Sequence, residues 1–234
     1  MNIIPSPVYQ KRLNIFLNEV SLYPVSCEKL ADGRSDEQWL DAVLEGGAKI
    51  VQLRDKESSD GRLLAKARYF RKRTLEAGAL FLINDRLDIA LLSDADGVHV
   101  GQEDLPPAEI RKLAPEMIIG LSCNTEEQAQ ELGVLEQKGI LPITYYNIGP
   151  LYSTGTKSGL RDFIGPESIA RYCRHCSALF TVMGGIKLSH VEDVVAAGGQ
   201  RIAVVTALTK SADITSETRK WIKAIAHAGA KQHG

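Results

Sequence analysis

The sequence predicts a single (β/α)₈ barrel, a TIM-barrel fold of the α/β class. Short β-branched or apolar runs alternate with longer amphipathic segments, a pattern that predicts parallel βαβ units covered by helices. Eight strands in about 200 residues favour a closed barrel over an open doubly wound sheet. The eight runs lie at residues 22–25, 50–53, 80–83, 97–100, 118–121, 143–148, 180–183 and 202–205.

Helix-like segments fill the intervals between these strands. Thr125 with Gln128, and Ser189 with Glu192, have the spacing of capping boxes, which predicts that helices begin there. One or two glycines follow several of these helix-like segments, at the positions where we expect the helices to end. The clearest helical segments are residues 36–45, 61–77, 125–137, 189–197 and 213–226.

The length and organisation of the chain indicate one domain. At 234 residues it has the size of one α/β barrel, and no Pro/Gly/Ser-rich linker divides it. We expect residues 21–234 to form the barrel domain. Residues 1–20 resemble an extra amphipathic helix that could cover the bottom of the barrel.

Composition and charge limit the kinds of partner that the protein is expected to bind. The formal net charge is −1, and no basic face or tail stands out, which argues against nucleic acid or a membrane surface. Lys11 and Arg12 interrupt the N-terminal segment, and no apolar run approaches the ~20 residues of a membrane helix. We therefore expect a cytoplasmic protein with reduced cysteines and small-molecule ligands. Homo-oligomerisation stays open.

Cationic and amide side chains follow the second strand. Because side chains alternate along a strand, Gln52, Arg54 and Lys56 share one side. One interpretation is a solvated strand end. The apolar run at residues 50–53 favours burial instead, and buried cations at a rim usually have an anionic partner.

Two acids stand on neighbouring loops, after the third and fourth strands. Asp85 and Asp104 could share one Mg²⁺, which takes one or two carboxylates and completes its shell with water and phosphate oxygens. Alternatively, Asp85 caps a helix beginning near Leu87, and Asp104 caps one beginning at Pro106. Their joint position opposite a cationic strand favours the metal site.

The remaining loops add donors for oxyanions. Ser122, after the fifth strand, could hydrogen-bond a ligand ring or cap the next helix, although Thr125 is better placed as the cap. The loop at residues 149–159 is rich in hydroxyls and glycine, and it carries a lysine. Gly-Gly at residues 184–185 and a hydroxyl at Thr206 match the barrel phosphate site that follows the seventh and eighth strands.

Taken together, these motifs resemble the thiamine phosphate synthase family over roughly residues 20 to 210. The segment from Ile83 to Pro106 is the most specific, because barrel packing does not require it. The resemblance also covers Ile119-Gly120-Leu121-Ser122, Gly149-Pro150, Thr154-Gly155-Thr156-Lys157, Gly184-Gly185-Ile186 and Ala203-Val204-Val205-Thr206. It implies that an aminopyrimidine methyl diphosphate and a thiazole phosphate are joined to give thiamine phosphate, with release of pyrophosphate.

The resemblance also implies roles for individual residues. Asp85 and Asp104 would ligate Mg²⁺, and Ser122 would face the pyrimidine. The pyrimidine diphosphate would be held by Gln52, Leu53, Arg54, Asp55, Lys56 and Asn84, with Lys157 closing over it. The thiazole phosphate would be bound by Thr154, Gly155, Thr156, Gly185, Val205 and Thr206.

This chemistry needs stabilisation of a leaving diphosphate and no general base. Arg54, Lys56, Lys157 and Mg²⁺ would supply that stabilisation, which suits a site without a Ser–His or Cys–His pair. The chain departs from the family pattern where Thr144-Tyr145 replaces an Asp-Tyr pair and where Asn147 replaces a glycine. A third departure is Ser153, which replaces a proline.

Two other functions are compatible with the fold. One is a thiazole tautomerase-like isomerase, but that enzyme would carry a proton-shuttling histidine two residues after Ser122, where this chain has Asn124. The other is a non-catalytic barrel that binds phosphate ligands. Retention of both acids and all three cations argues against such a loss of turnover.

Overall fold

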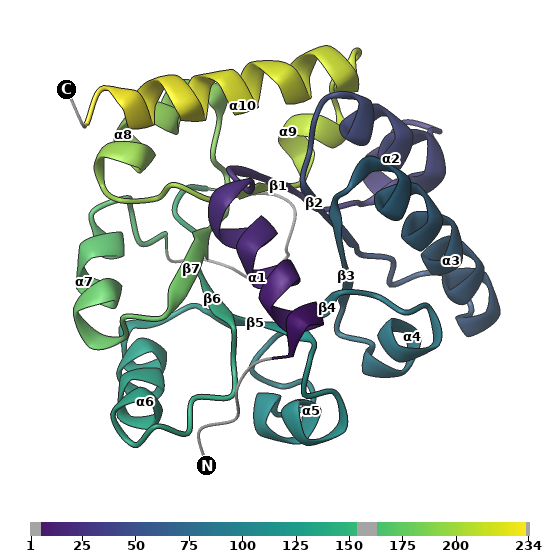
Figure 1. Ribbon diagram of the computed structural model, residues 1–234. Coiled ribbons are helices and arrows are strands. Elements are labelled where there is room, and N and C mark those ends of the chain that lie inside the picture. The colour runs from purple at the N-terminus through teal and green to yellow at the C-terminus, as the bar shows by residue number, and fades with distance from the viewer. Residues whose placement is uncertain (1–5, 154–162, 233–234) are drawn as a thin grey trace.

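Eight parallel strands form the predicted barrel (Figure 1). The computed structural model describes residues 6–153 and 163–232. The strands pair in the order β1-β8-β7-β6-β5-β4-β3-β2, and a parallel bridge between Val25 and Gln52 connects the two end strands. Their bounds are β1 (Leu22–Pro24), β2 (Ile50–Leu53), β3 (Leu80–Asn84), β4 (Gly97–Val100), β5 (Ile118–Cys123), β6 (Tyr145–Ile148), β7 (Leu179–Val182) and β8 (Ile202–Val204).

Side chains along each strand alternate between two apolar cores, as the pleat of a barrel strand requires. In β3, Leu80 and Leu82 lie in the inner core, inside the barrel, whereas Phe81 and Ile83 lie in the outer core, between the strands and the helices. The inner core is built largely from the first residues of the strands. Inward positions toward the strands' C-terminal ends are therefore left for polar side chains.

Helices cover the outside of the strand ring (Figure 1). Most of the predicted helices begin within one residue of the position expected from the sequence. Thr125 and Gln128 form the predicted capping box. Ser189 is not a cap as predicted, because a short 3-10 helix, η2 (Leu188–His190), precedes α8. The helices of the barrel are α2 (Asp36–Glu45), α3 (Asp60–Ala77), α4 (Leu87–Leu92), α5 (Pro107–Leu113), α6 (Glu126–Gln137), α7 (Ser168–His175), α8 (Val191–Ala196), α9 (Thr206–Thr209) and α10 (Ile214–Ala230), with a 3-10 turn η1 (Glu28–Leu30) after β1.

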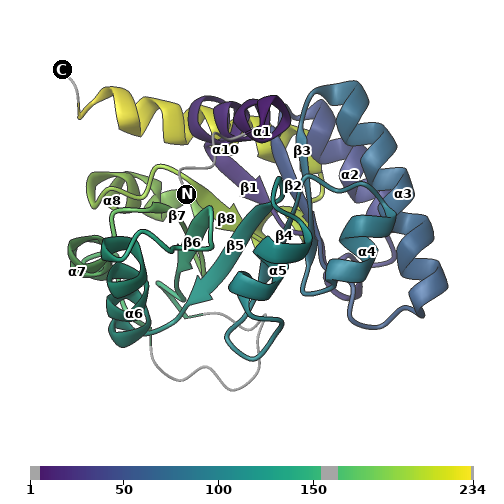
Figure 2. The same cartoon turned by 60° about the horizontal axis from the view of Figure 1, so that its bottom comes forward.

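An additional helix, α1 (Pro7–Asn18), lies across the end of the barrel where the strands begin (Figures 1 and 2). Phe16 of α1 is fully buried in the inner core, and its ring lies 4.9 Å from that of Tyr145. Arg12 Nε donates to Asp96 Oδ1 at 2.9 Å, which connects the helix to the segment before β4. No helix in the described ranges is long and apolar enough to cross a bilayer.

Candidate active site

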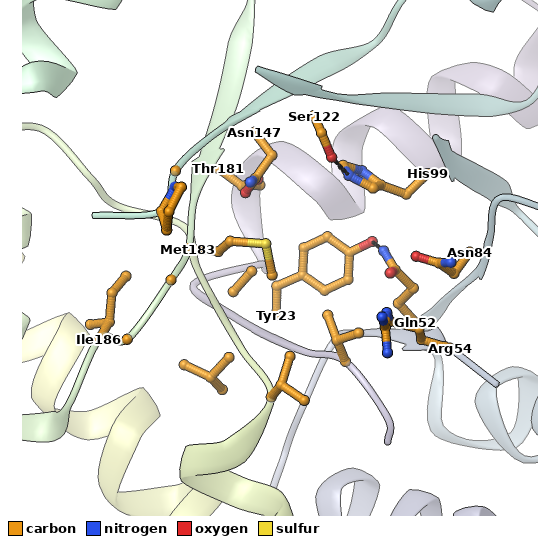
Figure 3. A pocket seen from close by; sticks show the side chains of 18 of the residues that line it. Tyr23, Gln52, Arg54, Asn84, His99, Ser122, Asn147, Thr181, Met183 and Ile186 are labelled. Carbon is orange, nitrogen blue, oxygen red and sulfur yellow. Dashed lines mark hydrogen bonds between the residues drawn. The ribbon is translucent and has the colours of Figure 1, made fainter. Parts of the chain in front are cut away.

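A cavity of about 430 Å³ opens at the C-terminal ends of the strands, the end opposite α1. Strand ends and the loops that follow β2 to β8 contribute its walls. Figure 3 shows side chains from several strands converging on this cavity from different directions. Because barrel enzymes place their catalytic groups at this end, the cavity is the candidate active site.

One wall of the cavity is polar and comes from the β2, β3 and β4 ends. Gln52 and Arg54 both line the cavity, while Val51 lies in the outer core, as strand alternation requires. Lys56 follows from the same loop, and Asn84 ends the neighbouring strand. The Arg54 side chain forms no hydrogen bond or ion pair within the described part of the chain, so its guanidinium is available to a ligand.

Both predicted metal ligands line this polar wall. Asp85 has a left-handed φ of 62° that directs its carboxylate toward Lys56, whose Nζ lies 2.9 Å from Oδ2. Asp104 Oδ2 accepts a hydrogen bond from the Gly101 amide at 2.7 Å. Neither acid caps a helix: α4 and α5 begin after Arg86 and Pro106, without a side-chain cap.

Two residues of the second-strand motif lie away from the cavity. Leu53 is 1% exposed and packs in the outer core. The Asp55 carboxylate accepts from Lys66 Nζ at 2.6 Å and from the Glu57 and Ser58 amides at 3.0 Å. Neither side chain is therefore among those that line the cavity. Four further predicted residues, Thr154, Gly155, Thr156 and Lys157, lie outside the described residues.

The opposite wall comes from β7, β8 and the loops that follow them. Gly184 and Gly185 have φ values of 100° and 62°. A Cβ at Gly185 would lie 2.2 Å from the Ser153 carbonyl oxygen, so only glycine permits this loop to pack against the segment after β6. Apolar and small side chains form most of the rest of this wall, namely Met183, Ile186, Val204, Val205, Thr206 and Ala207, and Lys187 adds a positive charge beside them.

A chain of hydrogen bonds crosses the barrel beneath the cavity. Gln52 Nε2 donates to Tyr23 Oη at 2.8 Å, and Tyr23 Oη lies 3.0 Å from Tyr145 Oη. His99 Nδ1 lies 2.9 Å from Tyr145 Oη, and His99 Nε2 lies 3.0 Å from Ser122 Oγ. Figure 3 shows the Gln52–Tyr23 and His99–Ser122 hydrogen bonds of this network among the side chains that line the cavity. The expectation of a site without a Ser–His pair is therefore wrong, because β4 and β5 bring these side chains together.

Burial sets the protonation of this chain and of a nearby thiol. It raises the pKa of both Tyr23 and Tyr145, so both phenols stay protonated and each donates one hydrogen bond. Burial also raises the pKa of Cys123, next to Ser122, to about 12. That thiol lies in the outer core and is not an activated nucleophile.

A second cluster of charges lies beside the cavity, around a second hollow that shares Arg54 and Lys56 with it. Carboxylate oxygens of Glu28, Asp36 and Asp55 lie within 4.8 Å of one another. Lys66 is 4% exposed and forms ion pairs with all three, at 2.9 Å to Asp36 and 2.6 Å to Asp55. The Lys66 ammonium thus already occupies the position between these carboxylates that a cation would take.

Sequence reasoning missed several residues of the site. Tyr23, His99, Asn147 and Thr181 all line the cavity, and Thr181 Oγ1 donates to Asn147 Oδ1 at 2.8 Å. Strand alternation contains a signal for them, because each is a polar residue flanked by residues that pack outward. His99 between Val98 and Val100 shows this most clearly.

Comparisons with known proteins agree with this geometry. Residues 22–208 match the protein family described as Thiamine monophosphate synthase. The chain belongs to this family. A thiamine-phosphate synthase of Methanospirillum hungatei is 42% identical over 211 residues, which cover 90% of this chain and 100% of that protein. A thiamine-phosphate synthase of Shouchella clausii is 36% identical over 208 residues, covering 88% and 97%.

A solved structure supports the same family. The structure of thiamine phosphate pyrophosphorylase from Pyrococcus furiosus aligns with a TM-score of 0.80 and 29% identity, over 91% of this chain and 98% of that chain. That structure thus shares this chain's barrel across nearly its whole length. The family match ends at residue 208, within α9, so it includes both walls of the cavity.

Proposed function

We propose that this chain is a thiamine phosphate synthase, a transferase that joins an aminopyrimidine methyl diphosphate to a thiazole phosphate. The observation that carries the proposal is the division of one cavity into two chemically different walls. Arg54 and Lys56 provide two positive charges on one side, and the β7–β8 loops provide apolar surface, a Gly-Gly turn and the single cation Lys187 on the other. Two substrates, one of them a diphosphate, match such a division.

The reaction exchanges one bond at the methylene carbon. The C–O bond to the diphosphate breaks, and pyrophosphate departs with the electron pair. A C–N bond then forms from the lone pair of the thiazole nitrogen, which carries no proton. The electron-rich aminopyrimidine can support a methylene cation between these steps, so no covalent enzyme intermediate is needed.

The side chains at the polar wall stabilise the charge that develops on the leaving group. Arg54 offers a guanidinium suited to bidentate contact with phosphate oxygens. Lys56 adds a second positive charge and, at 53% side-chain exposure, can turn from Asp85 toward a ligand. Fixed charges aimed at the departing diphosphate lower the barrier because the protein need not reorganise during bond cleavage.

The site also fits Mg²⁺, which we propose as the cofactor. Asp85 and Asp104 are hard oxygen donors that line the same cavity, and neither is used as a helix cap. They are the residues that would hold the ion. When bound, Mg²⁺ neutralises charge on the leaving diphosphate. Asn84, at the end of β3, would orient the diphosphate beside it.

Residues of the remaining sequence motifs complete the proposed substrate contacts. Ser122 and Gln52 would face the pyrimidine, and Gly185, Val205 and Thr206 would hold the thiazole phosphate. Lys157 is proposed to close over the diphosphate, with Thr154, Gly155 and Thr156 on the thiazole phosphate. Leu53 and Asp55 would act indirectly, because Leu53 packs in the outer core and Asp55 pairs with Lys66. They would hold the loop that carries Arg54 and Lys56 in place.

The decisive assay mixes the purified protein with both substrates and Mg²⁺ and follows thiamine phosphate and pyrophosphate by mass spectrometry. We expect the two products in equal amounts, and none when either substrate is omitted. Isomerisation of the thiazole phosphate alone would identify a tautomerase, although Asn124 offers no titrating group for proton transfer. Binding of both ligands without product would identify a non-catalytic barrel.

We further propose a cytoplasmic location, where both substrates would be available and thiols stay reduced. All four cysteines are free in the structure, which agrees with a reducing compartment. A homo-oligomer is a second expectation, to be tested by light scattering. A signal for a dimer or larger species at micromolar concentration would support it, and a monomer would remove it.

A further inference from the structure

The hydrogen bonds beneath the cavity connect Gln52 to Ser122 through Tyr23, Tyr145 and His99. We propose that Tyr23, Tyr145 and His99 are positioning residues that fix Ser122 as a hydrogen-bond donor, and the Gln52 side-chain carbonyl as an acceptor, toward the cavity. The proposal rests on the proposed function, in which these two groups face the aminopyrimidine. It also makes one claim about the free protein that needs no substrate.

The direction of the chain follows from its first member. Gln52 Nε2 donates to Tyr23 Oη, and among the described contacts of Tyr23 the acceptor for its own phenol hydrogen is Tyr145 Oη, so we orient that hydrogen toward Tyr145. Tyr145 then donates its own hydrogen to His99 Nδ1. With Nδ1 as an acceptor, a neutral imidazole carries its proton on Nε2.

The last bond decides what Ser122 can do. A protonated His99 Nε2 would donate to Ser122 Oγ, which would leave the serine hydrogen available to a ligand in the cavity that Ser122 lines. A histidine in this form cannot take a proton from the serine. The Ser122–His99 pair is therefore the reverse of a nucleophile and its general base, in which Nε2 must be unprotonated. The opposite chain direction would make Ser122 an activated nucleophile.

The surrounding packing holds the chain in one geometry. Tyr145 is fully buried, and its ring packs on Phe16 of α1 at 4.9 Å and on His99 at 5.6 Å. Gly120 of β5 leaves room for both groups: a Cβ there would lie 2.4 Å from Tyr145 Oη and 2.5 Å from His99 Nδ1. Helix α1 thus supports the site through Phe16 and Tyr145.

The two fixed groups match one kind of ligand edge. A 4-aminopyrimidine presents a ring nitrogen that accepts a hydrogen bond beside an amino group that donates one. A serine hydrogen and an amide carbonyl are the complementary pair. These hydrogen bonds link Gln52 to Ser122 across the barrel. Removing any one of them should therefore let the Gln52 amide or the Ser122 hydroxyl rotate. Affinity for the pyrimidine should fall, and affinity for the thiazole should stay the same.

The first test reads the histidine tautomer in the ligand-free protein. ¹⁵N NMR distinguishes protonated from unprotonated ring nitrogens, and the spectrum of His99→Asn identifies the His99 signals among the five histidines. We expect neutral His99 to carry its proton on Nε2. A proton on Nδ1 would overturn the proposal and would favour a serine nucleophile, whatever reaction the protein catalyses.

The second test separates KM for the two substrates. Tyr145→Phe keeps the ring and removes one hydroxyl, and should raise KM for the pyrimidine diphosphate about tenfold, as expected for one net hydrogen bond. KM for the thiazole phosphate should stay unchanged. His99→Gln, whose amide can reach Ser122, should retain more pyrimidine affinity than His99→Asn, whose shorter amide reaches only Tyr145.

A matched control lies one residue away. Tyr146→Phe removes a buried hydroxyl that bonds the Cys176 carbonyl oxygen at 3.1 Å in the outer core, and should change neither KM. Tyr23→Phe provides a second break if Tyr145→Phe does not fold. The proposal is wrong if the wild type is active but the folded Tyr23, His99 and Tyr145 variants keep the wild-type KM for the pyrimidine diphosphate. If the wild type forms no thiamine phosphate, the proposed function fails. The tautomer test still decides in which direction the hydrogen bonds between Gln52 and Ser122 are donated.

Discussion

Lys56 Nζ lies 2.9 Å from Asp85 Oδ2, an ion pair that joins the β2 and β3 loops at the rim of the cavity. The lysine carries the charge of one proposed diphosphate contact, and the carboxylate is one proposed magnesium ligand. In the free protein the two groups neutralise each other. Ligand binding would replace this pair with a lysine–phosphate contact and a carboxylate–metal contact, so the two binding events should be linked.

Removing either metal-binding carboxylate should weaken metal and diphosphate binding together. Asp85→Asn and Asp104→Asn keep the side-chain volume and remove a negative charge, so each should lower the affinity for Mg²⁺ at least about tenfold. Calorimetric titration of Mg²⁺ in the presence of pyrophosphate measures this directly. Asp88→Asn is the control, because Asp88 is paired with Arg86 on the surface. Unchanged affinity in both variants would exclude these residues as ligands.

Arg54 should contribute mainly to the chemical step. Arg54→Ala should reduce kcat/KM at least about 100-fold, the scale expected for one preorganised electrostatic contact. Steady-state kinetics of pyrophosphate release measures the effect. Arg86→Ala is a suitable control, since this nearby arginine pairs with Asp60 and Asp88 and does not line the cavity. Near-normal turnover of Arg54→Ala would rule out its proposed role.

Lys66 should stabilise the loop that carries Arg54 and Lys56. Lys66→Met leaves three carboxylates without their ammonium, and should reduce the free energy of unfolding at pH 7 by about 3–5 kcal/mol. Urea denaturation measures this loss. The same substitution at Lys72, an exposed residue on the same helix, should change stability little.

The loss should shrink as the pH falls. Burial already raises the pKa of Asp36 to about 6, against the opposing hydrogen bond from Lys66. Without that lysine, carboxyl pKa values in the folded state should rise further above their unfolded values. A raised carboxyl pKa means that the folded state binds protons first, so lowering the pH adds stability. Denaturation at pH 5 should therefore show a smaller difference between Lys66→Met and wild type than at pH 7, and an equal or larger difference would contradict this account.

Gly120 should tolerate no side chain. The Cβ of Gly120→Ala would meet Tyr145 and His99 atoms at 2.3–2.5 Å, which overpacks the barrel interior and should cost about 1–3 kcal/mol of stability. Thermal unfolding provides the measurement. Gly61→Ala is the control, since a Cβ there meets nothing within 4 Å and alanine favours the helix. Equal melting temperatures for the two variants would show that the interior can rearrange.

Much of the fold could be predicted from sequence because the signals were local. Each apolar run predicts a strand by itself, and the eight runs together predict the barrel. The capping box of Thr125 and Gln128 likewise depends on four consecutive residues. Ser189 had the same spacing, but the chain there forms a 3-10 turn closed by Lys187 and His190. Spacing alone cannot distinguish these two outcomes.

The candidate site was predictable where strand alternation and loop position agree, as for Gln52 and Arg54. It was less predictable where partners come from distant strands. Asp55 stands between two cavity residues, yet its carboxylate turns back to a buried lysine on α3. His99 and Ser122 are 23 residues apart, and only the pairing of β4 with β5 brings them within 3.0 Å. Long-range contacts of this kind leave no local pattern.

The central claim is that a metal-bound diphosphate lies between Arg54 and the two acids Asp85 and Asp104. A crystal structure with Mn²⁺ and pyrophosphate tests it most directly, because anomalous scattering locates the metal. The account predicts one ion in contact with both carboxylates, and pyrophosphate oxygens within hydrogen-bond distance of Arg54. An ion bound instead at the Glu28, Asp36 and Asp55 cluster, or pyrophosphate held away from Arg54, would contradict it.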